Sequence, residues 1–145
     1  MTDAAARELL ARIDPAWAAF RNAVEARRAD GFGARTASGW TIRAMLAHVA
    51  AWHDATSFRL FRFAATLHGQ PKVEADDDAF NDRVASETED RSDDQVLSAL
   101  DRSFDRLRVA VGELPPGFAA ADDGWVEAVV AGNTFDHYAE HLDEL

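Results

Sequence analysis

One long polar connection decides the fold: Gly69-Gln70-Pro71-Lys72-Val73-Glu74-Ala75-Asp76-Asp77-Asp78, continuing to about Arg91. It separates two segments that have clear helical periodicity. The connection begins with acidic residues and becomes weakly helical through Phe80 and Val84, which indicates a link with a short helix rather than a core helix. A link of this length allows the helices on either side of it to run parallel, as in four-helix bundles with a crossover connection.

Four longer segments around this connection carry apolar residues three or four positions apart, which is helical spacing. Thr41 is a candidate N-cap, and Ser92 with Gln95 has the spacing of a capping box. Gly69 and Pro71 are typical of a helix end. The sequence therefore predicts a single all-α domain over residues 1–145, an up-down-down-up four-helix bundle with helices over about 3–30, 41–68, 92–113 and 123–144 and a long crossover between the second and third.

Two histidines near the end of the chain, His137 and His141, lie four residues apart in a helical segment. That spacing puts them on one helix face, where two imidazoles can bind one metal ion. In an up-down-down-up bundle the second and fourth helices are antiparallel, so His48, near the start of the second helix, falls at the same end of the bundle. His53 points about 140° away from His48, so at most one of these two can join the pair.

The composition restricts the partners of the protein. A formal net charge of -11 argues against nucleic acid, because phosphate binding requires clustered lysine and arginine. The chain has no cysteine, so thiol chemistry would need a thiol brought by a substrate. No basic, apolar leader is visible and no apolar run approaches the roughly 20 residues of a membrane span, so we expect a cytoplasmic protein that does not associate with membranes.

The order and spacing of several short motifs resemble those of the DinB-like superfamily over essentially the whole chain. The motifs are Gly39-Trp40-Thr41, Leu46-Ala47-His48 with Trp52, Phe80-Asn81, the Ser92-capped helix and His137-Tyr138-Ala139-Glu140-His141. The chain looks most similar to the DfsB and ClbS branch, and more distantly to the N-terminal domain of mycothiol-dependent maleylpyruvate isomerase. The resemblance implies a homodimer with a divalent metal held by His48, His137 and His141. Members include thiol-dependent isomerases and transferases and a self-protection protein that acts on a reactive genotoxin.

Three neutral imidazoles around Zn²⁺ or Ni²⁺ leave a coordination position open, as in catalytic rather than structural sites. The sequence therefore predicts a metal-dependent enzyme that acts on a small molecule with activated water, as a hydrolase, or with a low-molecular-weight thiol, as a transferase. The alternative is a non-catalytic binding or sequestration module whose histidines are structural or vestigial. Candidate substrate-binding residues are Trp40, Trp52, Asn81 and Tyr138, although tryptophans such as Trp40 and Trp52 belong more often to the core than to a substrate wall.

Overall fold

The computed structural model describes residues 2–145, and within this range the chain forms helices and no β-strand. The prediction of an all-helical fold is therefore confirmed. The helices are α1 (Ala4–Arg27), α2 (Ile42–Thr66), α3 (Asp77–Thr88), α4 (Asp93–Gly112), α5 (Trp125–Asn133) and α6 (Phe135–Leu142), with short 3-10 turns at Arg28–Asp30 and Ala121–Gly124. Across the same described range, no helix is both long and apolar enough to cross a membrane.

The ends of the helices follow from local hydrogen bonding. Thr41 caps α2 by accepting a hydrogen bond from the Ala44 N–H, and Ser92 and Gln95 form the reciprocal capping box at the start of α4. At its other end α2 stops at Leu67, which adopts the left-handed conformation with φ 58°. These caps fix where α2 and α4 begin, and therefore fix the level of His48 in the bundle.

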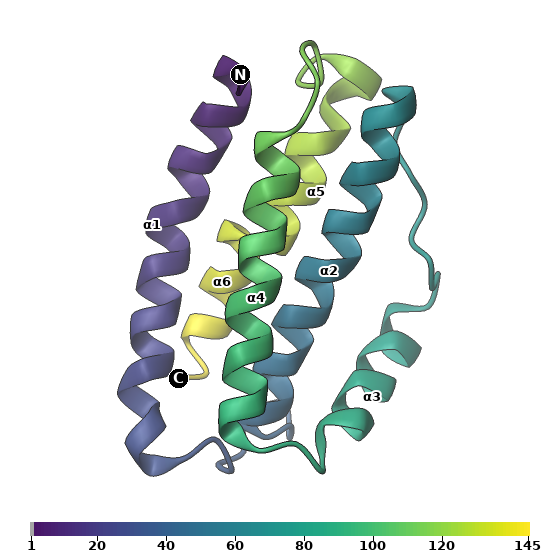
Figure 1. The fold of residues 1–145 in the computed structure, drawn as a ribbon. Coiled ribbons are helices and arrows are strands. Elements are labelled where there is room, and N and C mark those ends of the chain that lie inside the picture. Colours follow the sequence, from purple (N-terminus) through teal and green to yellow (C-terminus); the bar gives the residue numbers. More distant parts are fainter. Residues whose placement is uncertain (1) are drawn as a thin grey trace.

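The four long elements are arranged as two pairs that run in opposite directions (Figure 1). α1 and the α5–α6 segment run away from the end of the bundle that holds the N-terminus, whereas α2 and α4 run back toward it. α3 lies on the outside of the bundle and packs against α2. The long connection predicted from sequence thus carries a helix of 12 residues, and its N-terminal half brings Phe80 and Asn81 to the surface of α2.

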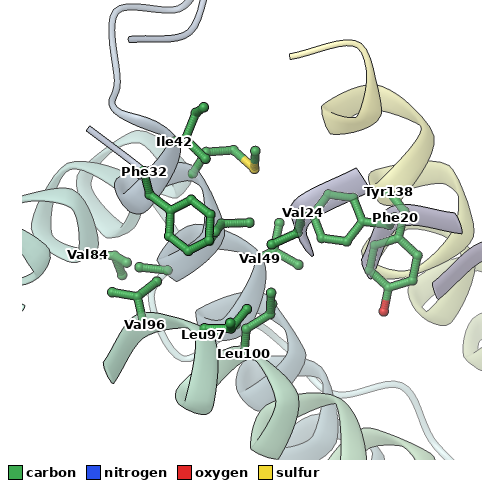
Figure 2. Packing of buried hydrophobic residues seen from close by; sticks show 14 residues of the cluster. Phe20, Val24, Phe32, Ile42, Val49, Val84, Val96, Leu97, Leu100 and Tyr138 are labelled. Atoms are coloured by element: carbon green, nitrogen blue, oxygen red, sulfur yellow. The ribbon is translucent and has the colours of Figure 1, made fainter. Parts of the chain in front are cut away.

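The core consists of two clusters of buried apolar side chains. The first surrounds the start of α2 and includes Leu46, Val49, Leu100, Phe20 and Tyr138 (Figure 2). The second fills the opposite end of the bundle, where the first turns of α1 meet the last turns of α2 and α4. Because Leu46, Ala47 and Val49 belong to the first cluster, His48 projects from a rigidly packed part of α2.

The last predicted helix, 123–144, is in fact interrupted. Thr134 has φ -127° and ψ -105°, which separates α5 from α6. Its hydroxyl donates to the Val130 carbonyl, and the Asn133 amide donates to the Val129 carbonyl. Such local side-chain bonds compete with the helical ladder. The prediction of one continuous helix was therefore wrong, and α6 is a separate helix of eight residues.

Candidate metal centre

The structure brings His48, His137 and His141 together at one end of the bundle. The Nε2 atom of His137 lies 2.9 Å from Nε2 of His48 and 3.0 Å from Nε2 of His141. His137 and His141 come from successive turns of α6, and His48 comes from the second turn of α2. These three residues form a group whose ligand atoms all lie within 4.8 Å of one another. We refer to them as the histidine triad.

Asn81 of α3 fixes the orientation of His48. Its Oδ1 atom lies 3.0 Å from Nδ1 of His48 and accepts a hydrogen bond of 2.9 Å from Nε1 of Trp52. The indole nitrogen is only ever a donor, so the Asn81 atom facing both rings is the carbonyl oxygen. His48 must then carry its proton on Nδ1, which leaves the Nε2 lone pair directed at the triad. Sequence reasoning placed Asn81 and Trp52 at a substrate wall and missed this orienting role.

Glu144 orients His141 in the same way. Its carboxylate accepts a hydrogen bond from Nδ1 of His141, so the Nε2 lone pair of His141 also faces the triad. The tail that carries Glu144 is held in place because Arg27 donates a hydrogen bond of 3.2 Å to the Leu145 carbonyl. Glu144 was not predicted. The signal that could have identified it is an acidic residue three positions after a candidate ligand, at a helix end.

The Nε2 lone pairs of His48 and His141 both face Nε2 of His137, which can donate a hydrogen bond to only one of them. A neutral imidazole carries a single N–H, so at most one of its two short Nε2 contacts is a hydrogen bond. Its Nδ1 atom is buried and has no hydrogen-bond partner among residues 2–145. Buried polar atoms without partners are rare in native proteins. A cation at the point where the three Nε2 atoms meet would accept all three lone pairs, so this donor set fits a divalent metal.

The protonation state of the triad also suits a metal. Burial, supplemented by the neighbouring histidines, lowers the pKa of His48 to about 4 and that of His137 to about 3, from an ordinary value of 6.5. The hydrogen bond to Asn81 acts in the opposite direction on His48 but is the smaller effect. Both rings are therefore neutral near pH 7, as metal coordination requires.

A cavity of about 440 Å³ opens beside the triad. Trp40 and Trp52 both lie near His48, with ring centroids 5.3 and 6.5 Å from its imidazole. The remaining wall is polar, and it includes Lys72, Asn81, Asn133 and Glu140. Apolar faces with a few polar groups are typical of sites for small molecules.

Two other predicted residues occupy different positions. Tyr138 is only 2% exposed, and its hydroxyl lies 2.6 Å from Nε2 of His53 in the core. The prediction that Tyr138 binds substrate is corrected for this reason: the residue after His137 is turned about 100° around α6, away from the cavity. His53 is fully buried beside Tyr138 and Ser103 and is not part of the triad.

Comparison with known families matches residues 13–135 to the model described as the mycothiol maleylpyruvate isomerase N-terminal domain. The matched range contains His48 but ends before His137 and His141. No curated protein and no solved structure matches the chain. The assembly of the complete triad therefore rests on the geometry of this chain.

Proposed function

We propose, since this chain belongs to the mycothiol maleylpyruvate isomerase N-terminal domain family, that it is a metal-dependent protein that brings a low-molecular-weight thiol to a small reactive molecule. His48, His137 and His141 would hold the metal. The observation that carries this proposal is the convergence of three Nε2 atoms, two of them fixed as acceptors by Asn81 and Glu144. Zinc or nickel suits a site of neutral imidazoles.

The description of the family, which names a mycothiol maleylpyruvate isomerase, favours a thiol over water. The chain has no cysteine of its own, so such a thiol would arrive with a ligand. A bound divalent ion would supply a Lewis acid that favours the thiolate form of such a ligand. The residues of the chain would bind and orient the ligand: the Trp40 and Trp52 rings offer apolar faces, and the ion pair of Lys72 with Asp77 offers polar groups at the rim.

Calorimetric titration of mycothiol into the metal-loaded and the metal-free protein tests this function. We expect binding that is at least tenfold tighter with metal, and loss of that difference when the sulfhydryl is replaced by hydroxyl in the ligand. Equal affinity in both forms would indicate a sequestration module. Metal-dependent cleavage of ester substrates without any thiol would favour the hydrolase instead.

Asn81 provides a sharper prediction. Changing Asn81 to leucine removes the acceptor for both His48 Nδ1 and Trp52 Nε1, so His48 loses its fixed orientation. Outer-shell partners of this kind contribute about 10–100-fold to metal affinity. We expect a loss in that range, measured by competition with a chelator. Asn133→Leu is the matched control, because Asn133 lines the same cavity but donates to the Val129 carbonyl; an equal loss in both variants would contradict the role of Asn81.

We also propose that residues 1–145 form one domain of the DfsB and ClbS branch, built as an up-down-down-up four-helix bundle. The parallel course of α2 and α4 in Figure 1 supports this topology. A cytoplasmic location would suit it, because low-molecular-weight thiols are kept reduced there.

A homodimer is a further proposal, and the exposed apolar face of α2 and α4 supports it. Phe61 is 76% exposed and Val109 is 58% exposed, and both border a groove of about 690 Å³ between the two helices. Light scattering at micromolar concentration should give twice the 15.9 kDa mass of the chain, and Phe61→Asp should give the single mass. A wild-type protein that scatters as one chain would exclude the dimer.

A further inference from the structure

The position of α6 is not set by continuity with the helix before it. The break at Thr134 separates α6 from α5, and α6 has only eight residues. It packs chiefly against α1 and α5, whereas His48, the third member of the triad, belongs to α2. Some other contact must hold α6 at the correct position relative to α2 for His137 and His141 to reach His48.

A buried chain of hydrogen bonds makes that contact. The Ser103 hydroxyl donates to the Leu100 carbonyl at 2.8 Å, so its oxygen is free to accept the Nδ1 proton of His53, also at 2.8 Å. The Nε2 atom of His53 is then an acceptor, and the Tyr138 hydroxyl donates a hydrogen bond of 2.6 Å to it. The chain therefore runs in one direction, from Tyr138 in α6 through His53 in α2 to the backbone of α4.

Both side chains are neutral, which keeps this direction constant. Burial lowers the pKa of His53 to about 3 and raises the pKa of Tyr138 above its usual range. His53 and Ser103 are both fully buried, so water does not compete for these bonds.

We propose that Tyr138 and His53 are positioning residues for the metal centre, because their hydrogen bond ties α6 to α2 at the level where the triad assembles. Tyr138 immediately follows His137 and lies about 60° around the helix from His141, so its anchored hydroxyl limits rotation of the face that carries both ligands. This inference rests on the proposed metal-binding function.

Substitutions can separate the contribution of the Tyr138 ring from that of its hydroxyl. The ring stacks on Phe20, with centroids 5.3 Å apart, and packs against Trp17 at 5.6 Å. Tyr138→Phe keeps these ring contacts and removes only the bond to His53. His53→Gln keeps the hydrogen bond to Tyr138, because a side-chain amide also offers an acceptor and a donor. His53→Leu loses the hydrogen bonds to both Tyr138 and Ser103.

Co²⁺ is the probe, read by its dissociation constant and by its visible absorption spectrum. We expect Tyr138→Phe and His53→Leu to raise the dissociation constant about tenfold and to change the spectrum, as loosened ligand orientation would. His53→Gln should bind like the wild type. Val111→Ala, a buried change at the far end of α4, is the control for general destabilisation, and it should lower the melting temperature without altering either readout.

The outcomes separate the two proposals. If the wild type binds Co²⁺ and Tyr138→Phe matches it in affinity and spectrum, the positioning role is wrong and the metal centre stands. If Val111→Ala weakens binding as much as Tyr138→Phe does, the effect is one of stability, and the positioning role is again overturned. A wild type that binds no Co²⁺ overturns both the positioning role and the metal centre.

Discussion

Replacing His141 with alanine is expected to weaken metal binding about a hundredfold while the helical circular dichroism stays close to that of the wild type. His141 supplies one of three imidazole nitrogens, and its side chain, 14% exposed, lies at the end of the bundle outside both core clusters. Structural zinc sites bind with about 10–16 kcal/mol in total, so losing one ligand costs about 3 kcal/mol, or roughly a hundredfold in Kd. Competition with a chromophoric chelator measures this change directly.

His68→Ala is the matched control for that experiment. His68 is an exposed histidine beyond the end of α2 and is remote from the triad, so its loss should leave metal binding unchanged. If His141→Ala binds the ion as tightly as the wild type does, the triad is not the metal centre. Equal losses in both variants would indicate adventitious binding by surface histidines.

Acidification of the metal-free protein is expected to reduce its free energy of unfolding steeply. The pKa of His48 is lowered to about 4 and those of His53 and His137 to about 3, mainly by burial. The histidines of the unfolded chain have pKa values near 6.5. At pH values between 6.5 and the lowered pKa values, the unfolded chain therefore binds protons that the folded chain does not. Stability therefore rises with pH through this window and is lost as the pH falls below about 6.5.

Each of these histidines contributes at most about 1.4 kcal/mol per pH unit, or about 2 kcal/mol between pH 6.5 and 5. Three together approach the whole stability of a typical domain, about 5–15 kcal/mol. Urea unfolding at pH 7.5 and pH 5 measures the loss. His53→Gln removes one titrating group, so its stability should fall less over the same interval; a wild type that is equally stable at both pH values would show that the buried histidines are not held neutral.

The helices and the triad could be predicted because they depend on local spacing. The caps at Thr41 and Ser92 fix where two helices begin, and the four-residue interval between His137 and His141 places both on one face wherever α6 lies. The position of His48 followed from the direction of the helices, which the length of the connection indicated.

Other features could not be read from the sequence because they depend on tertiary contacts. Gly132 and Asn133 precede Thr134 and are typical of helix ends, but all three residue types are also tolerated inside helices, so the sequence alone did not establish the break between α5 and α6. The helical pattern placed Tyr138 beside the ligands, but only the packing of Phe20 and His53 shows that it faces the core. Asn81 was predicted to touch substrate, and its hydrogen bond to His48 emerges only once α3 is docked on α2.

The metal content of the wild-type protein, purified without an affinity tag, tests the central claim most directly. Three converging imidazole nitrogens predict one zinc or nickel ion per chain by elemental analysis, retained through dialysis at pH 7.5 and released below about pH 4, where His48 and His137 protonate. A content far below one ion per chain, which does not rise after incubation with Zn²⁺ or Ni²⁺ and removal of the excess, would contradict the assignment of the triad as a metal centre.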